Sequence, residues 1–239
     1  MISSETIKEF AVRNQTSEMN VVREYIQNLF LSYLYQQDRS EQILFKGGTA
    51  LKLIHKSPRY SEDLDFTGFV IREKDIETIL KRTLVAVNRE GLYMKFTESK
   101  PTSGGYLSII EGTAGEWKPR ILINVSLRPK TVEKEAVLIA NPFMPPYLVF
   151  SLPEDQMVLE KINALLKRKK PRDFFDLYFI LRKGISRKIV VSHKNKLMSE
   201  IKEIDDKAIS RELKLFLPRS FWPVIRNLRE NLIRELERH

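Results

Sequence analysis

A pair of glycines, set between a short apolar run and an apolar segment with helical spacing, constrains the fold of this chain more than any other feature. The run Ile43–Phe45 predicts a buried strand. Gly47 and Gly48 allow backbone conformations that other residues avoid, and they let a ligand approach the main chain. Thr49 then occupies the position expected for the N-cap of a helix that continues to Ile54. The unpaired N–H groups at such a helix start can bind an anion.

Two carboxylates follow this predicted helix after a short loop. If residues 63–66 form a strand, Asp63 and Asp65 lie on one face, and Leu64 and Phe66 lie on the other. The Cα atoms of the two acids would be about 6.6 Å apart, from a rise of roughly 3.3 Å per residue. Two carboxylates at this spacing can converge on one divalent metal or on a pair of metals. Mg²⁺ suits the site because it takes oxygen ligands and shares them with substrate phosphates.

Each half of this pattern also has a purely structural explanation. Gly-Gly-Thr is common at strand-to-helix turns, and Asp-x-Asp often caps a loop or pairs with a surface cation. The conjunction is more specific, because a strand precedes the glycines, a helix follows them, and a second strand carries both acids on one face. We therefore predict that Lys46–Thr49 binds the phosphates of a nucleoside triphosphate and that Asp63 and Asp65 bind its metal.

A second group of candidate residues lies on two predicted helices after residue 150. Lys161 lies beside the apolar face of the first helix and would project into a cleft; alternatively, it is a surface lysine whose stem covers apolar surface. Pro171 is expected to open the next helix, which places Asp173 in the first turn, where acids favour the helix dipole and capping is an alternative role. Asp176, one turn later, is harder to explain as a cap. Arg172 would pair with one of these acids or contact a phosphate.

Three stretches of the sequence together resemble a known family. Lys46–Phe66 resembles the signature of the nucleotidyltransferase superfamily that includes DNA polymerase β, in which Gly-Ser is followed after a spacer by Asp-x-Asp. Two shorter motifs narrow this resemblance, Lys-Gly-Gly-Thr-Ala-Leu and Ser-Glu-Asp-Leu-Asp-Phe. They are similar to motifs of the AbiEii-type toxins, which belong to type IV toxin–antitoxin and abortive-infection systems. Thr49 stands where the superfamily often has Ser. Pro153–Leu165 and Lys167–Tyr178 resemble the later motifs of the family, a helix with a catalytic lysine and an Arg-Asp-x-x-Asp-Leu helix.

This resemblance implies a metal-dependent enzyme that transfers a nucleoside monophosphate from an NTP to an acceptor and releases pyrophosphate. It implies Mg²⁺, or Mn²⁺ in its place, as the cofactor, RNA such as tRNA as the acceptor, and a cognate antitoxin as a partner. Lys161 would contact the triphosphate, and Asp173 or Asp176 would complete the catalytic site.

The superfamily commonly has a third carboxylate on a strand next to the Asp-x-Asp strand. The best candidate strand here is Ile121–Ser126, in which alternation places Asn124 at the position where the resemblance leads us to expect an acid. An amide can offer an oxygen to Mg²⁺, but it supplies no negative charge. We therefore expect Asp173 or Asp176 to replace the missing charge.

Charge favours a polyanionic substrate. The chain carries a net charge of +10, and five of the six residues in Lys167–Arg172 are basic. Such a run is often only a solvated linker between helices, but here it adjoins the predicted site, which favours RNA. No base-reading motif is present, so the charge indicates affinity rather than sequence specificity.

Composition excludes several other classes of site. The chain has no cysteine, which excludes disulfides, thiolate chemistry and Cys-based zinc sites. The three histidines, His55, His193 and His239, are scattered. No signal peptide and no run of about 18 apolar residues is present, so we expect no membrane association and a cytoplasmic protein.

We expect an α+β fold of two domains. Residues 1–150 would form a nucleotidyltransferase-like catalytic domain with helices and a mixed, mostly antiparallel sheet, after a polar and loosely held start over residues 1–19. Arg120–Leu127 and Ala136–Ile139 are predicted strands of this sheet. Residues 151–239 would form a helical domain that contributes to the active cleft.

Two other functions fit the same residues. The chain would be a kinase-like enzyme if it transferred a phosphoryl group to a protein or small molecule. It would be a nucleotide-binding module if it bound an NTP without catalysis.

Overall fold

The structure is a computed structural model that describes residues 2–238. The chain divides into two compact units. The first comprises Met1–Lys56 and Tyr60–Leu152, and the second comprises Ser57–Arg59 and Pro153–His239. Arg59 thus belongs to a different unit from the residues on either side of its short segment.

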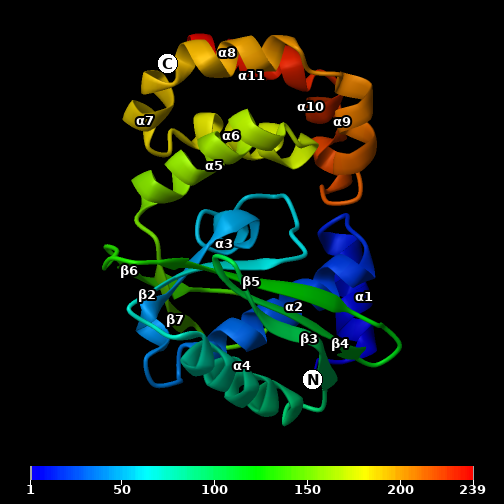
Figure 1. The fold of residues 1–239 in the computed structure, drawn as a ribbon. Coiled ribbons are helices and arrows are strands. Elements are labelled where there is room, and N and C mark those ends of the chain that lie inside the picture. Colours follow the sequence, from blue (N-terminus) through cyan, green and yellow to red (C-terminus); the bar gives the residue numbers. More distant parts are fainter. Residues whose placement is uncertain (1, 239) are drawn as a thin grey trace. The chain divides into compact units, whose positions relative to one another are not determined.

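The first unit is built on a seven-stranded sheet with the order β3-β4-β5-β2-β1-β7-β6 (Figure 1). The pairs β1/β7 and β2/β5 are parallel, and the other neighbouring strands are antiparallel. The fold is therefore α+β with a mixed, mostly antiparallel sheet, as predicted. The strands are β1 (Ile43–Lys46), β2 (Leu64–Phe69), β3 (Tyr93–Thr102), β4 (Gly105–Thr113), β5 (Arg120–Arg128), β6 (Glu135–Ile139) and β7 (Tyr147–Ser151).

Within the described residues, four α-helices accompany this sheet. Apolar residues along α2 and α4 are buried, and the two helices lie side by side below the sheet in the view of Figure 1. Burial of such apolar faces against a sheet is the main source of stability in a layered fold of this kind. The helices are α1 (Ser4–Arg13), α2 (Glu18–Leu34), α3 (Gly47–Leu53) and α4 (Glu73–Asn88).

The N-terminal segment differs from the prediction. Residues 1–19 were expected to be loosely held, but α1 occupies most of this segment, and Ile7 and Ala11 are buried. The side chain of Ser3 caps the helix by accepting a hydrogen bond from the backbone N–H of Thr6 at 3.1 Å. The apolar residues are only a few among many polar ones, but their four-residue spacing puts them on one helix face, and that face is sufficient for docking.

The turn between β1 and α3 also differs from the prediction in detail. The expected strand is present, but α3 begins at Gly47 directly after β1, so Thr49 lies inside the helix and is not its N-cap. The N-cap position belongs to Lys46, whose side chain makes no capping hydrogen bond. Gly47 has φ of +87°, which lets the extended strand turn into the helix without a separate cap residue.

The second unit is helical. Its core contains apolar residues of successive helices, among them Leu165, Phe175, Leu197 and Leu232, each of which is fully buried. Within this unit α6 packs against α5, α9 and α11 (Figure 1). The helices are α5 (Glu154–Arg168), α6 (Pro171–Lys183), α7 (Arg187–Ser192), α8 (Lys194–Lys202), α9 (Asp206–Leu213), α10 (Trp222–Arg226) and α11 (Leu228–Glu237). Within residues 2–238, the helices are all too short or too polar to cross a membrane.

Candidate active site

The strand-to-helix turn holds the carboxylate of Asp65. Lys46 and Asp65 are partners in the antiparallel β1/β2 ladder, so the turn begins beside the acid. A Cβ atom added to Gly47 would lie 2.8 Å from the Cβ of Asp65 and would also overlap its Oδ2. Glycine is therefore required here both by the positive φ and by the close approach of the acid. The glycine pair and the Asp-x-Asp motif meet through this contact.

Asp63 lies immediately before the strand that carries Asp65. β2 begins at Leu64, and Leu64 and Phe66 are buried whereas the two acids are half-buried, so the predicted alternation is confirmed. The hydroxyl of Thr49, which is buried within α3, donates a hydrogen bond to the backbone carbonyl of Asp63. Thr49 thus anchors the segment that presents Asp63.

Asn124 stands beside Asp65, in the position that the family resemblance implied. The two residues are partners in the parallel β2/β5 ladder. The side-chain Nδ2 of Asn124 donates to Oδ1 of Asp65 at 3.3 Å. This contact holds one oxygen of the carboxylate, while the other oxygen faces the turn at Gly47. The amide of Asn124 therefore restricts the orientation of the Asp65 carboxylate.

The donor set in the first unit fits a magnesium ion shared with a substrate. Within residues 2–238, no three His, Cys, Asp or Glu side chains cluster closely enough to form a metal site by themselves. Mg²⁺ nevertheless does not require such a cluster, because it is usually held by one or two carboxylates together with substrate phosphates and water. Asp63 and Asp65, with an amide alongside, match this requirement.

A buried ion-pair network surrounds Asp176 in the second unit. Its Oδ1 accepts a hydrogen bond from Nε of Arg59 at 2.7 Å. Its Oδ2 accepts one from the NH2 group of Arg59 at 3.0 Å and one from Nζ of Lys161 at 2.8 Å. Burial raises the pKa of Asp176, but the charges and hydrogen bonds of Arg59 and Lys161 outweigh this effect and lower the pKa to about 2. The carboxylate is therefore ionised at neutral pH.

The role of Arg59 in this network was not anticipated from the sequence. Arg59 lies 117 residues before Asp176, and nothing in their separate patterns links them. One signal was available: an acid on the inward face of an amphipathic helix needs a cationic partner, since an isolated buried carboxylate is very costly. That requirement could have directed attention to an arginine, but it could not have identified which one.

Asp173 has the contacts of a helix cap. It is buried, and its Oδ2 accepts a hydrogen bond from the backbone N–H of Lys170 at 3.3 Å, at the start of α6. Arg168 donates to both of its carboxylate oxygens, at 2.6 and 2.8 Å. These are the contacts of the capping role that was considered for this residue, and Pro171 opens the helix as predicted.

Within residues 2–238, some cations of the basic run have an acidic partner and others have none. Lys169 forms an ion pair with Glu200 at 2.6 Å, in addition to the pair between Arg168 and Asp173. Lys167 and Lys170 are exposed. Within the described part of the chain, the buried Nε atom of Arg172 has no hydrogen-bond partner, so it does not bind either nearby acid.

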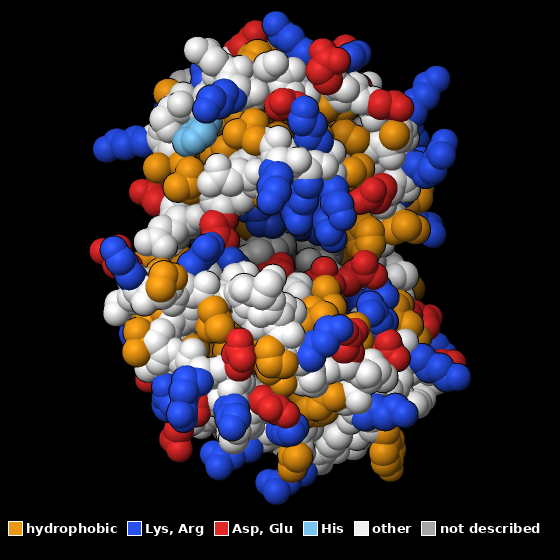
Figure 2. Space-filling model, viewed as in Figure 1, with side chains coloured by type: hydrophobic (Ala, Val, Ile, Leu, Met, Phe, Trp, Pro, Cys, Tyr) orange, Lys and Arg blue, Asp and Glu red, His pale blue; other side chains and the backbone are white. Residues whose placement is uncertain are grey.

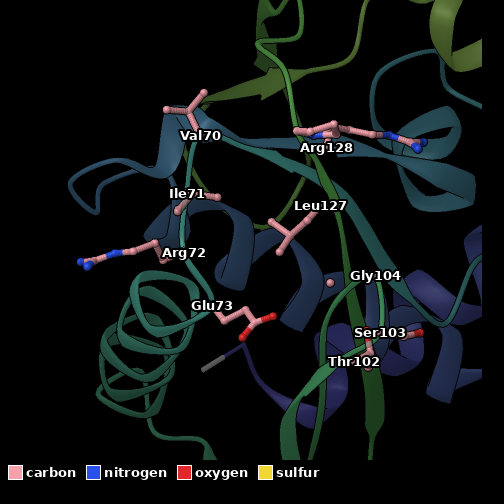
Figure 3. Close-up of a pocket in the computed structure, with 11 residues that line it drawn as sticks. Val70, Ile71, Arg72, Glu73, Thr102, Ser103, Gly104, Leu127 and Arg128 are labelled. Atoms are coloured by element: carbon pink, nitrogen blue, oxygen red, sulfur yellow. The ribbon is translucent and has the colours of Figure 1, made fainter.

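A separate cavity of about 570 Å³ lies at the other end of β2. Figure 3 shows Ile71, Leu127 and Glu73 around it, whereas the side chains of Arg72 and Arg128 extend away from it in opposite directions. A triphosphate needs converging cations. The cavity therefore lacks the groups expected of the nucleotide site, and it follows the C-terminal end of the strand whose N-terminal end carries Asp65.

Sequence comparison defines the class of this protein. The model of the family described as nucleotidyl transferase AbiEii toxin, type IV TA system, matches residues 29–238. The chain therefore belongs to the AbiEii family of nucleotidyltransferase toxins. Membership implies an NTP substrate and a cognate antitoxin. No curated protein sequence matches the chain significantly.

Solved structures share the fold. MenT4, a nucleotidyltransferase toxin from Mycobacterium tuberculosis H37Rv, superposes with a TM-score of 0.67 at 15% identity, over 99% of this chain and 90% of that one. A Helicobacter pylori protein assigned as a nucleotidyltransferase gives 0.65 at 18% identity, over 92% and 94% of the two chains. JHP933 from Helicobacter pylori gives 0.62 at 18% identity, over 93% and 95%.

Proposed function

We propose that this protein uses Mg²⁺ to transfer a nucleoside monophosphate from an NTP to an RNA acceptor, as the toxin of a type IV toxin–antitoxin pair. The observation that carries the proposal is the packing of the Asp65 carboxylate against Gly47, with Asn124 at its side. This arrangement supports a metal site next to a glycine turn within a chain of the AbiEii family.

Asp63 and Asp65 would hold the metal. When bound, Mg²⁺ would offset the negative charge of the reacting phosphates and orient them. Mn²⁺ takes the same oxygen ligands and is the alternative ion. Because Gly47 has no side chain, the carboxylate of Asp65 can approach the backbone of the turn closely. The hydrogen bond from Thr49 to the backbone carbonyl of Asp63 holds Asp63 at the start of the strand.

The triphosphate would be bound by cations and by the glycine turn. Lys46, Gly47, Gly48 and Thr49 form the turn beside Asp65, and we assign triphosphate oxygens to it. Lys161 is assigned the same ligand. It keeps two of its three ammonium N–H groups after one is used by Asp176.

The basic run would contact the RNA acceptor. Figure 2 shows Lys and Arg side chains gathered over the part of the second unit that contains α5 and α6. Because two of the five cations in the run are already bound to Asp173 and Glu200, we assign the phosphate contacts to Lys167, Lys170 and Arg172. A tRNA is one acceptor that fits this charge.

Labelled nucleotides test the reaction directly. The protein would be incubated with Mg²⁺, total RNA and each NTP labelled at the α- or the γ-phosphate, with Asp65→Ala as the inactive control. We expect α-label in RNA only with the wild type. Transfer of γ-label would instead indicate a kinase-like enzyme, and nucleotide binding without transfer of either label would indicate a non-catalytic module.

The RNA contact has its own matched test within the run. Lys170→Gln and Lys169→Gln remove the same charge one residue apart, but Lys169 is paired with Glu200. Loss of a phosphate contact should reduce the log–log salt slope of RNA binding by roughly 0.7 to 0.9 for Lys170→Gln, and by less for Lys169→Gln. Equal slopes for both variants and the wild type would show that the run is a solvated linker.

A further inference from the structure

We propose that Arg59 is a positioning residue for nucleotide binding: it fixes the carboxylate of Asp176, and Asp176 in turn fixes the ammonium group of Lys161. All three residues belong to the second unit. The inference rests on the proposed function, in which Lys161 binds the triphosphate.

Arg59 and Asp176 form a planar, two-point contact. The Nε and NH2 groups of Arg59 approach the two different oxygens of Asp176, at 2.7 and 3.0 Å. The side chains are only 4% and 1% exposed, respectively. A guanidinium bound in this way fixes the plane of the carboxylate as well as its position, which a lysine at the same place could not do. Asp176 is therefore held in one orientation.

Asp176 transmits this orientation to Lys161. The lysine side chain is flexible in isolation, with a four-carbon stem. Here its Nζ lies 2.8 Å from Oδ2 of Asp176, and the side chain is only 12% exposed. The ammonium group is thus fixed in place before any ligand arrives, and a pre-ordered group loses less conformational entropy when it binds.

The same contacts exclude a metal ion from the carboxylate of Asp176. Both of its oxygens accept hydrogen bonds from cations, and the three side chains together carry a net charge of +1. A metal ion at this carboxylate would have to displace Arg59 or Lys161 and would be repelled by the other cation. A triphosphate is attracted by the same net charge. The network therefore suits an anionic ligand.

The first test compares Arg59→Gln, Arg59→Lys and a control on the same helix as Asp176. Binding of non-hydrolysable NTP analogues should weaken at least about tenfold in Arg59→Gln, and transfer should slow by up to about 100-fold because a binding group is misplaced. The analogue affinity and the transfer rate of Arg59→Lys should lie between those of Arg59→Gln and those of the wild type. Arg182→Gln, which breaks the α6 pair with Glu235 at 3.1 Å, should bind the analogues normally.

The second test asks whether Arg59 acts through Lys161. In a Lys161→Ala background, Arg59→Gln should cause no further loss of analogue affinity, because the group it positions is absent. The double variant Arg59→Gln/Asp176→Asn guards against unfolding, since it replaces the ion pair with two neutral amides that can still hydrogen-bond. Thermal melting of each variant verifies that it is folded.

Two results would overturn the inference, and a third would overturn only the proposed function. If folded Arg59→Gln binds analogues as Arg182→Gln does, Arg59 has only a structural role and the inference is wrong. An equal loss with and without Lys161 would also overturn it, because Arg59 would then act independently. If the wild type transfers no α-phosphate, the proposed function fails, while normal analogue binding would still allow the positioning role to be measured.

Discussion

Asp65 in the first unit and the acids Asp173 and Asp176 in the second unit are bound in opposite ways. Asp65 is half-buried, touches Gly47 and accepts one hydrogen bond from the amide of Asn124; it makes no ion pair within residues 2–238. Asp173 and Asp176 are almost fully buried, and every carboxylate oxygen of these two accepts a hydrogen bond from a cation.

The partners of an acid, rather than its motif, therefore indicate its role. A carboxylate whose charge is already balanced by the protein stabilises the fold or positions its cationic partner. A carboxylate without a cation beside it retains the capacity to bind one from solution. Asp65 is such a carboxylate within residues 2–238, so we favour a metal site built on Asp65 and substrate phosphates, in place of the expectation that Asp173 or Asp176 supplies the missing charge.

The strongest test of this comparison is Asp65→Ala. Transfer of α-label should fall by roughly 1,000-fold or more, because charge stabilisation at the reacting phosphates is usually a large catalytic contribution. The thermal midpoint should change little, since Asp65 makes no ion pair in the described residues and its side chain is only half-buried. Near-normal turnover of the folded variant would remove Asp65 from the mechanism.

The opposite behaviour is expected of Asp176→Asn, which should destabilise the protein at pH 7 by about 3 kcal/mol because it leaves Arg59 and Lys161 buried without a counter-charge. The pKa of Asp176 is lowered from its ordinary 3.8 to about 2, so the ionised carboxylate adds stability above pH 4. This contribution of about 2 kcal/mol is lost as the pH falls from 4 through 2. Urea unfolding at pH 7 and at low pH measures both quantities.

An exposed ion pair provides the contrast for that experiment. Asp75 also has a pKa lowered to about 2, chiefly by its hydrogen bond from Arg72, but both Arg72 and Arg39 beside it are solvent-exposed. Asp75→Asn should therefore destabilise the protein much less than Asp176→Asn. If the two substitutions have equal effects, burial does not distinguish the Asp176 network.

Gly47→Ala tests the contact between the turn and Asp65. A side chain at Gly47 is disfavoured by φ of +87° and also overlaps the acid, whereas Gly184 has φ of +68° with open space around it. Gly184→Ala should cost about 1 kcal/mol, and Gly47→Ala should cost about 1 kcal/mol more because a neighbour must shift. Transfer should fall only in Gly47→Ala. Equal effects at both glycines would mean that backbone strain alone matters.

Local patterns were sufficient to predict the secondary structure around Asp65. The apolar run of β1 and the alternation around Asp65 follow from a period of two residues, which depends only on neighbours in sequence. The same alternation placed Asn124 on the polar face of its strand, and the resemblance supplied the expectation that this strand lies next to β2.

The unpredicted features depend on contacts between distant segments. Thr49 was interpreted as a cap because a hydroxyl at a helix start usually is one, but the partner that decides its role is the carbonyl of Asp63. Arg59 pairs with a residue on a helix of the second unit, and no spacing rule connects them. Period and propensity describe single elements, so they cannot determine which side chains become paired when elements are brought together.

The smallest loss of transfer that we expect at the metal site concerns Asn124. Because its Nδ2 steadies Oδ1 of Asp65 at 3.3 Å, Asn124→Ala should slow transfer only about tenfold, as expected when a partner that orients a metal ligand is removed. Excess Mg²⁺ should restore part of this loss. Ser126→Ala is the matched control, because Ser126 lies on the same face of β5 but pairs with Thr67 in the ladder. This substitution should leave the rate of transfer nearly unchanged.

Asn124→Asp sharpens the same question. A third carboxylate beside Asp65 would repel it in the absence of metal, but it would lower the Mg²⁺ concentration needed for half-maximal transfer, because it adds negative charge to a site of oxygen ligands. If instead Asn124→Ala is as inactive as Asp65→Ala at saturating Mg²⁺, the amide itself is a required ligand. The contrast between Asp65 and the acids of the second unit would then be incomplete, since the first unit would bind its metal through an amide as well as through carboxylates.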